Sequence, residues 1–372
     1  MPLSGLTPFL QTLREAGLWR DLRPPEGVCF SHNDYLGLSQ HPHLKEAGER
    51  FFRDGRAGSR GSRLLGGNSY DALETEQAIA DFFGAPAAVF FSSGYLANLG
   101  VVGALARVAR AFASDAHNHA SLIDAIRLSK KPCTIVPHQG WADWTADADD
   151  WVLVAESLYS MSGCIVAEES LRGALRRSQG FLFLDEAHAG GILGPGGRGV
   201  SAPWREWDAM AVGITFGKAF GAAGGAVLCS TQVRDLLVNA ARPFIYSTAP
   251  APVVLALVRA SLEVMQNEGE ALRERLRARI GHVVGVLREA GIALEGDAER
   301  GSPILSLPLP GNDRALRFAR TMRNSGWDLR AIRYPTVAAG SERIRLSVTL
   351  AVTQQQTEQM AQEVVKQWKA FS

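Results

Sequence analysis

Three side chains of different chemistry follow two short apolar runs near the middle of the chain. Residues 181–184 (FLFL) lead directly into Asp185, and His188 comes three residues later. Residues 211–215 (AVGIT) lead through a turn to Lys218. Such runs are typical of buried parallel strands, and open α/β sheets bind ligands at the carboxyl ends of their strands. We therefore expect a carboxylate, an imidazole and an amine at one sheet edge, the set that a pyridoxal phosphate (PLP) site needs.

Each of the three residues has a separate task at such a site. Lys218 would form the Schiff base with the cofactor, because a desolvated lysine loses its proton more easily and becomes nucleophilic. Asp185 would keep the pyridine nitrogen protonated, and His188 would donate to the phenolic oxygen. Taken one at a time, the three also fit a surface lysine, a strand-end cap and a packed loop histidine.

The phosphate of such a cofactor would be bound where a strand meets a helix. Residues 87–91 read as a strand and residues 94–110 as a helix. The backbone N–H groups of Gly94 and Tyr95 would then lie at a helix N-terminus, which attracts anions.

Strand and helix patterns alternate around these sites. We expect strands at 87–91, 111–114, 133–136, 151–156, 181–185, 211–215 and 225–229, and helices at 74–83, 94–110, 120–129 and 166–177. This alternation predicts an α/β fold, in which helices cover both faces of a mainly parallel sheet.

A second, smaller domain is expected after Pro250 and Pro252. A helical stretch at 253–290 would lead into it as a hinge helix. Its expected elements are strands near 303–307, 329–332 and 343–348 and helices at 312–324 and 354–370. We expect an N-terminal arm at 1–36 with a short helix at 7–19, a large domain at 37–250 and a small α+β C-terminal domain at 251–372.

Motifs along nearly the whole chain resemble the α-oxoamine synthases, which are fold-type I PLP-dependent transferases. The two strongest are DEAH (185–188) and TFGKAFG (215–221). They are joined by NDYLGL (33–38), GSRGSRLLGGN (58–68), SSGYLAN (92–98), HNHASLIDA (117–125), ESLYSMSG (156–163), IYST (245–248) and AIRYPTV (331–337). The resemblance implies a seven-stranded-type large sheet and a homodimer with active sites at the interface.

The resemblance also implies roles for further residues. Ser160 would be a second donor to the phenolic oxygen, Thr215 would bind the phosphate, and Thr248 would contact the cofactor. His119 would lie flat on the cofactor ring and take part in catalysis, since an imidazole there both packs and can carry a proton. The implied substrate contacts are Arg333, as a bidentate carboxylate anchor, together with Arg20, Asn33 and Thr336.

The activity implied by the resemblance is a decarboxylative condensation of an amino acid with an acyl thioester of coenzyme A or acyl carrier protein. The chain is most similar to the branch that condenses L-alanine with a pimeloyl thioester in biotin biosynthesis. Alternatives are glycine or serine with another acyl thioester, transamination or a retro-aldol-type reaction on the same cofactor, and a non-catalytic nucleotide-binding protein.

Composition and motif spacing argue against other classes of function. The formal net charge is +1, which gives no reason to expect nucleic acid or an anionic membrane as a partner. The paired histidines of HNH lack a nearby third ligand, so no metal site is expected. Residues 194–199 match GxGxxG but do not link a strand to a helix. Four scattered cysteines, no secretory signal pattern and no apolar run of ~20 residues favour the cytoplasm.

Two segments depart from the family pattern. The family commonly has SMDGD where residues 160–164 read SMSGC, so Cys164 replaces an acid. The segment after Asn68 is shorter than usual and has Tyr70 and Asp71 instead of a histidine. Neither departure touches Lys218.

Overall fold

A seven-stranded sheet forms the centre of the larger part of the molecule, in the order β2-β8-β7-β6-β5-β3-β4. In the computed structural model, which describes residues 3–371, its strands in that order are Ala87–Phe91, Gly225–Cys229, Met210–Thr215, Phe181–Asp185, Trp151–Glu156, Ala111–Asp115 and Cys133–Val136. β8 runs antiparallel to β2 and β7, and the other neighbours are parallel. The predicted α/β class and mainly parallel sheet are confirmed; the reversed direction of β8 was not expected.

Side chains of these strands alternate between two apolar clusters. Val89 and Phe91 of β2 face one cluster, whereas Ala88 and Phe90 face the other. Successive side chains of a strand point to opposite faces, so a strand buried on both faces is apolar throughout. The flanking helices are α3 (Tyr70–Phe83), α4 (Gly94–Leu105), α5 (Ala120–Ser129), α6 (Glu168–Ser178), α7 (Thr231–Ala240) and α8 (Arg242–Ile245).

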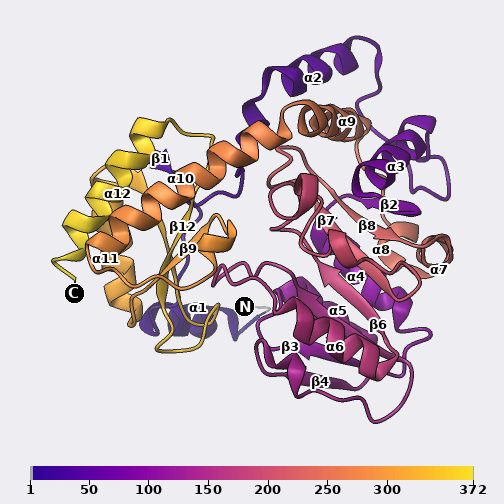
Figure 1. The fold of residues 1–372 in the computed structure, drawn as a ribbon, viewed down its shortest axis with the longest axis horizontal. Helices are drawn as coiled ribbons and strands as arrows, with labels where there is room; N and C mark the ends of the chain where they lie inside the picture. The colour runs from indigo at the N-terminus through magenta and orange to yellow at the C-terminus, as the bar shows by residue number, and fades with distance from the viewer. Residues whose placement is uncertain (1–2, 372) are drawn as a thin grey trace.

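A smaller antiparallel sheet, in the order β11-β12-β9, forms a second centre. Its strands in that order are Arg330–Ile332, Arg343–Ser347 and Ile304–Pro308, and α11 (Asn312–Asn324) packs beside this sheet. The helical stretch predicted over 253–290 is two helices, α9 (Pro252–Asn267) and α10 (Gly269–Glu289), which meet at Glu268. α12 (Gln354–Trp368) packs against α10 and α11. Figure 1 shows α10, in orange, crossing from the larger part to the smaller one.

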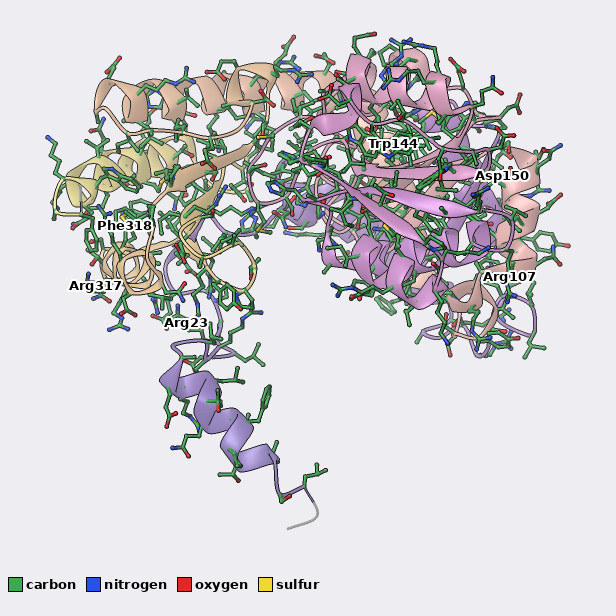
Figure 2. The ribbon with its side chains drawn as sticks, turned by 90° about the horizontal axis from the view of Figure 1, so that it is seen from below. Arg23, Arg107, Trp144, Asp150, Arg317 and Phe318 are labelled. Carbon is green, nitrogen blue, oxygen red and sulfur yellow. The ribbon has the colours of Figure 1, made fainter. Side chains whose placement is uncertain are left out.

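The N-terminal segment packs against the smaller sheet before the chain enters the larger part. β1 (Val28–Cys29) pairs in parallel with β10 (Trp327–Asp328). The backbone carbonyls of Phe30 and Tyr35 accept hydrogen bonds from Ser347 and Leu350. In contrast, α1 (Leu6–Glu15) buries none of its residues and projects from the body of the molecule (Figure 2).

Several helices are shorter than predicted or were not predicted. The predicted helix at 94–110 ends at Leu105, and α2 (Pro42–Asp54) and α7 had no counterpart among the expected elements. Within residues 3–371, no helix combines the length and apolar character needed to cross a membrane. The domain boundaries at 36 and 250 stay predictions.

Candidate active site

The carboxyl ends of three neighbouring parallel strands bring the predicted residues together. In the register of the sheet, Glu156 at the end of β5 pairs with Asp185 at the end of β6, and Asp185 pairs with Gly213 of β7. Two residues after Gly213, β7 ends at Thr215, and the turn that follows carries Lys218. The charges of Asp185 and Glu156 both act on the pKa of Lys218, so amine and carboxylates are neighbours.

Asp185 is buried and its carboxylate is held at both oxygens. Oδ1 accepts a hydrogen bond from the backbone N–H of Ala187 (2.8 Å), and Oδ2 accepts one from Nδ2 of Asn98 (2.7 Å). The bond to Ala187 is the cap that the residue type alone suggests. The bond from Asn98, a buried residue of α4, fixes the carboxylate further, so that Asp185 is positioned as well as capping.

Asn98 links Asp185 to His119 through Ser121. The Asn98 amide also donates to Oγ of Ser121 (2.8 Å), and Oγ lies 2.8 Å from Nδ1 of His119. The backbone N–H of Ser121 points at the same Nδ1 (3.2 Å). Two donors at Nδ1 leave it unprotonated, so we infer that Nε2 carries the imidazole hydrogen. His119 is exposed, and burial of part of its ring lowers its pKa.

His188 is buried beside Tyr35 of the N-terminal segment. Oη of Tyr35 lies 2.7 Å from Nδ1 of His188 and 3.2 Å from Oδ1 of Asn33. Burial raises the pKa of Tyr35 to about 12, so its hydroxyl keeps its proton. Burial, together with the charges of Lys218 and Arg345, holds the pKa of His188 well below its ordinary value. His188 is therefore a neutral imidazole.

Arg345 joins these residues to the smaller sheet. This buried arginine of β12 donates through Nε to the backbone carbonyl of Ser160 (2.6 Å), through Nη1 to Ser347 (2.9 Å) and through Nη2 to Oδ1 of Asn33 (3.0 Å). The Tyr35 hydroxyl has one hydrogen and two acceptors within reach, Oδ1 of Asn33 and the nearer Nδ1 of His188, and we infer that it donates to His188. Nε2 of His188 then keeps a hydrogen to donate.

Lys218 and Glu156 have pKa values that differ strongly from their ordinary ones. Burial lowers the pKa of the Lys218 amine to about 8, against the opposing effect of Asp185. Burial and the charge of Asp185 raise the pKa of Glu156 to about 8. Oε1 of Glu156 is buried without a hydrogen-bond partner. A lysine of this kind is deprotonated more easily than a surface lysine, as a nucleophile or base must be.

The predicted phosphate ligands lie next to each other. A Cβ on Gly94 would come within 3.3 Å of the Thr215 side chain, and a Cβ on Gly225 would come within 2.7 Å of the Gly94 backbone. The start of α4 therefore lies directly against the end of β7 and the start of β8, and glycines make this approach possible. The first N–H groups of a helix have no intrahelical acceptor, and those of Gly94 and Tyr95 begin α4 here.

Other predicted residues lie in a separate exposed group. Arg333 donates to the backbone carbonyls of Gly17 and Trp19 (2.6 Å to the latter), and Arg20 donates to Oγ1 of Thr336 (3.2 Å). These contacts hold the N-terminal segment against the loop after β11. Asn33 and Arg345 share the inner site, where the charge of Arg345 acts on Lys218, whereas Arg333 contacts the N-terminal segment. We infer that Arg345 is better placed than Arg333 to anchor a carboxylate near Lys218.

Thr248 is exposed and belongs to a third location. Its neighbour Ala249 donates to the carbonyl of Gly61 and accepts a hydrogen bond from Ser59 (2.6 Å). A cleft of about 760 Å³ adjoins this contact and is lined by residues 58–60, 66–73 and 249–250 together with Phe51, Gly55, Arg56, Arg63, Pro252 and Leu255. Thr248 therefore lies beside the glycine-rich segment.

Sequence reasoning missed four residues that the structure brings to the site: Asn98, Glu156, Tyr35 and Arg345. Glu156 could have been found, because it ends a strand predicted next to the one ending in Asp185. Tyr35 and Asn98 stand in motifs that the family resemblance covers, but their hydrogen bonds depend on contacts 153 and 87 residues away in sequence. Nothing in the sequence around Arg345 indicated a buried site residue, since arginines on a short strand usually face solvent.

The arrangement fits PLP at each of its functional groups. The held carboxylate of Asp185 suits the pyridine nitrogen, the neutral imidazole of His188 suits the phenolic oxygen, and the amine of Lys218 suits the aldehyde. The close approach of Gly94 to Thr215 forms the cradle that a phosphate needs. His119, held at its inner nitrogen and exposed, offers an imidazole face for a ring.

Comparisons with known proteins agree with this site. Residues 25–364 match the family model described as aminotransferase class I and II. The chain is 38% identical over 363 residues to an 8-amino-7-oxononanoate synthase from Mycobacterium sp. (strain JLS), covering 95% of this chain and 93% of that protein.

Solved structures of the same kind superpose on the chain. A serine palmitoyltransferase from S. paucimobilis, solved with bound PLP and myriocin, has a TM-score of 0.87 at 25% identity, covering 100% of this chain and 98% of that one. An 8-amino-7-oxononanoate synthase from Francisella tularensis has a TM-score of 0.77 at 28% identity, covering 92% of this chain and 98% of that one.

Proposed function

This chain belongs to the α-oxoamine synthase family, and we propose that it condenses L-alanine with a pimeloyl thioester. As a member of the family it is a PLP-dependent acyltransferase. The proposed reaction joins the alanine Cα to the acyl carbon, expels the thiol, releases carbon dioxide and gives 8-amino-7-oxononanoate for biotin synthesis. The observation that carries the PLP chemistry of this proposal is the meeting of Lys218, Asp185 and His188 at the carboxyl ends of β6 and β7.

Bound PLP supplies an electron sink for the carbanion formed at the amino acid Cα. Asp185, fixed by Asn98, keeps the pyridine nitrogen protonated, which strengthens that sink. Lys218 removes the Cα proton and later returns a proton to the product, a task suited to an amine with a pKa of about 8. His119 would pack against the cofactor ring, and Thr215 with the N–H groups of Gly94 and Tyr95 would hold the phosphate.

The amino acid carboxylate is bound by Arg345 in this proposal. Its guanidinium is buried and oriented by Ser160 and Ser347, so it is held in a fixed plane. A fixed planar fork binds a carboxylate through two parallel hydrogen bonds. Asn33 then donates to the same carboxylate through its amide, because its Oδ1 is already directed at Arg345.

The choice of substrates rests on the sequence likeness. The identity to proteins named 8-amino-7-oxononanoate synthase supports alanine and a pimeloyl thioester. The alternative is serine or glycine with another acyl thioester, which the close superposition on serine palmitoyltransferase favours. Both alternatives use the same chemistry at Lys218, so the structure near the strand ends fits either.

We further propose a homodimer in the cytoplasm. Leu65, in the glycine-rich segment, and Tyr70, at the start of α3 and in the lining of the cleft, expose 84% and 85% of their surface. Exposed apolar residues gathered around a concave surface are typical of protein interfaces. A second copy seated there would bring Thr248 to its partner's phosphate site.

All four cysteines are free, which supports the proposal of a reducing compartment, the cytoplasm.

The test is a matrix of L-alanine, glycine and L-serine, each with acetyl, succinyl, pimeloyl and palmitoyl thioesters. Thiol release and product mass are measured for every pair. The proposal expects alanine with pimeloyl thioester to be preferred and Lys218→Ala to be inactive with it. Preference for glycine or serine with another thioester would move the chain to a sister branch. Failure of every pair with PLP bound would overturn the synthase assignment.

A further inference from the structure

Glu156 is a buried carboxyl group beside the cofactor site, and the proposed mechanism gives it no task. It ends β5, and the register of the sheet pairs it with Asp185 at the end of β6. Both side chains are buried. Because neighbouring strands lie about 4.8 Å apart, paired side chains on the same face of a sheet are neighbours. The two strand ends therefore bring two carboxyl groups together away from water.

The side chains of Glu156 and Asp185 point to the same face of the sheet. Val154 of β5 and Phe183 of β6 both belong to the apolar cluster that α4 and α5 cover. Side chains two residues apart on a strand share a face, and the two acids each lie two residues further along. The hydrogen bond that Asn98 of α4 donates to Asp185 agrees with this direction.

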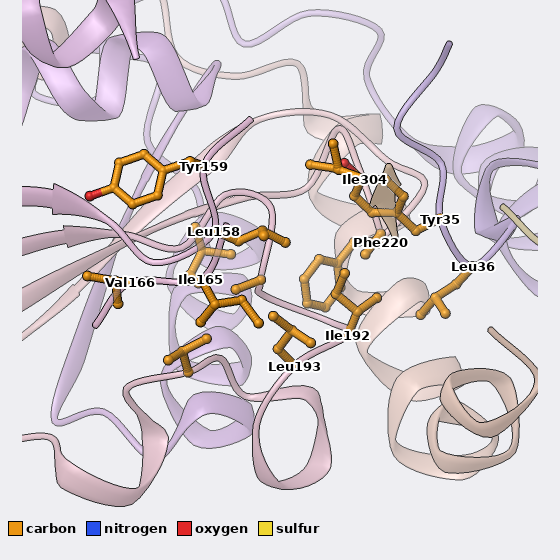
Figure 3. Packing of buried hydrophobic residues seen from close by; sticks show 14 of the residues in the cluster. Tyr35, Leu36, Leu158, Tyr159, Ile165, Val166, Ile192, Leu193, Phe220 and Ile304 are labelled. Carbon is orange, nitrogen blue, oxygen red and sulfur yellow. The ribbon is translucent and has the colours of Figure 1, made fainter. Parts of the chain in front are cut away.

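The backbone fixes this arrangement beyond the ends of the two strands. The N–H of Ser157 donates to the carbonyl of Asp185 (2.9 Å), and the carbonyl of Ser157 accepts a hydrogen bond from the N–H of Val166 (2.9 Å). Leu158 and Val166 then lie among buried apolar side chains (Figure 3). Glu156 cannot leave the site without breaking these contacts.

The hydrogen bonds of the site favour an ionised Asp185 and a protonated Glu156. Two buried carboxylates side by side repel each other, so one of the pair keeps a proton. Asp185 accepts from the N–H of Ala187 and from the amide of Asn98, and such donors stabilise a carboxylate. Oε1 of Glu156 is buried without a hydrogen-bond partner. The proton of the pair therefore belongs to Glu156.

The charges around Glu156 favour the same assignment. Burial and the charge of Asp185 raise the pKa of Glu156 to about 8. Lys218, from the turn after β7, and the backbone of His119 and Ser160, from the loops after β3 and β5, oppose this shift without reversing it. Glu156 is therefore uncharged at neutral pH and has one hydrogen to donate.

We propose that Glu156 is a positioning residue that, as a neutral acid, donates a hydrogen bond to the Asp185 carboxylate and keeps it ionised for the pyridine nitrogen. A donor lowers the basicity of the carboxylate that it binds. A less basic Asp185 leaves the proton on the pyridine nitrogen, where that proton strengthens the electron sink. This role rests on the proposed function, in which Asp185 serves the cofactor.

Two substitutions separate this role from simple packing. Glu156→Gln keeps the shape of the side chain and an N–H donor but cannot titrate, whereas Glu156→Leu fills the space without a donor. If Glu156 only fills space, the two variants behave alike. If its hydrogen bond supports Asp185, Glu156→Gln resembles the wild type towards the cofactor and Glu156→Leu does not.

The first measurement is the infrared spectrum of the cofactor-free full chain over a range of pH. A protonated carboxyl has a carbonyl stretch separate from the stretches of ionised carboxylates. We expect this band at neutral pH in the wild type and its weakening in Glu156→Gln; Glu186, also buried, contributes equally to both spectra. Asp185→Asn should move the titration of the band to lower pH, because the neighbouring charge that raises the Glu156 pKa is gone.

The matched control is Glu76→Gln, which removes a carboxylate that Arg63 holds at 2.8 Å. An arginine-paired carboxylate is ionised, so this variant should leave the acid band unchanged.

The second measurement is the nitrogen NMR shift of PLP labelled with ¹⁵N at the pyridine nitrogen and bound to each protein. This shift reports protonation of that nitrogen and does not depend on turnover. We expect the wild type and Glu156→Gln to be protonated alike, and Glu156→Leu to be less protonated. Turnover of Glu156→Leu should fall about tenfold, the effect of one charge-assisted hydrogen bond.

An acid band of equal strength in Glu156→Gln and wild type overturns the proposal, because Glu156 would then be ionised. An unchanged titration of the band in Asp185→Asn overturns it as well, since the proton on Glu156 would not depend on Asp185. Equal nitrogen shifts in Glu156→Leu and Glu156→Gln show that no donor is needed. The infrared tests need neither Glu156→Leu nor any substrate, so their outcome is separate from that of the proposed reaction.

Discussion

The hydroxyl of Tyr35 lies 2.7 Å from Nδ1 of His188, where the N-terminal segment meets the turn after β6. Through Asn33 the same hydroxyl is connected to Arg345. The residue expected to bind the amino acid carboxylate and the residue expected to bind the cofactor's phenolic oxygen therefore share one hydrogen-bond chain. Oδ1 of Asn33 only accepts, so the single hydrogen of the Tyr35 hydroxyl decides which nitrogen of His188 keeps its own hydrogen.

Replacing Tyr35 with phenylalanine should weaken PLP binding. The variant leaves Nδ1 of His188 without a donor, and loss of one buried hydrogen bond costs about 0.5–1.5 kcal/mol, a factor of roughly two to ten in affinity. The measurement is a visible-absorbance titration of cofactor-free protein with PLP. Tyr334→Phe, at an exposed tyrosine of the smaller part, is the control and should bind as the wild type does. Equal affinity in Tyr35→Phe would mean that the hydroxyl does not position His188.

Arg345→Lys should raise the concentration of L-alanine needed for half-saturation by about tenfold or more, because a point charge cannot reproduce a bidentate fork. Arg333→Lys should change it by less than about threefold, since the Arg333 guanidinium contacts the carbonyls of Gly17 and Trp19. The readout is the spectral change of the PLP-loaded protein on adding alanine, without a thioester. A larger effect at Arg333 would restore it as the carboxylate anchor.

Asp185→Asn should lower turnover about tenfold to a hundredfold, because buried charge-assisted hydrogen bonds contribute roughly 1.5–3 kcal/mol. Turnover should fall more than PLP affinity, since the carboxylate acts on the electron sink more than on attachment. Steady-state rates and a PLP titration on the same preparation separate the two effects. Wild-type turnover in this variant would reduce Asp185 to the cap that it forms with Ala187.

Glu156→Gln should flatten the pH dependence of stability of the cofactor-free protein. The pKa of Glu156 is raised to about 8 in the folded chain, so the folded state binds a proton that the unfolded state releases near the ordinary value. Stability from this group is therefore complete below the ordinary pKa and is lost as the pH rises towards 8.

Urea unfolding at about pH 5.5 and pH 8.5 measures this contribution, which is on the order of 2 kcal/mol. The wild type should lose more stability between the two values than Glu156→Gln does. His188 and His138 also titrate in this range, and they cancel in the difference between variant and wild type. Lys218 does not cancel, because Glu156 raises its pKa; loss of that effect lowers the Lys218 pKa further and flattens the loss of stability in the same direction. Glu46→Gln, at an exposed position, should match the wild type. Parallel curves for Glu156→Gln and wild type would contradict a raised pKa.

The main sheet could be predicted because its strands, apart from the largely exposed edge strand β4, are buried on both faces. Runs such as 87–91 and 181–185 are therefore continuously apolar, and their observed bounds agree with the prediction. The direction of β8 could not be predicted, because an apolar run has the same pattern in either direction. The break at Glu268 was missed because helical periodicity continues on both sides of it.

The site residues that directly follow a strand could be predicted, whereas those positioned by long-range contacts could not. Lys218, Asp185 and His188 follow predicted strands, so the strand order alone brings them together. The position of the Arg345 guanidinium is set by hydrogen bonds to Asn33 and Ser160, which belong to two other segments. Such long-range contacts cannot be predicted from the residues around Arg345. The carboxylate anchor was therefore expected at Arg333, in a motif that resembles the family, while the buried guanidinium lies twelve residues later.

The central claim is that the turn after β7 presents the cofactor-binding lysine, and borohydride reduction of the PLP-loaded protein tests it most directly. Reduction fixes PLP on the lysine that holds it, and peptide mass spectrometry identifies that residue. We expect the yellow colour to disappear and the added mass to be found on Lys218. Added mass on any of the other lysines, namely Lys45, Lys130, Lys131, Lys366 and Lys369, would contradict the account, as would a protein that fixes no cofactor.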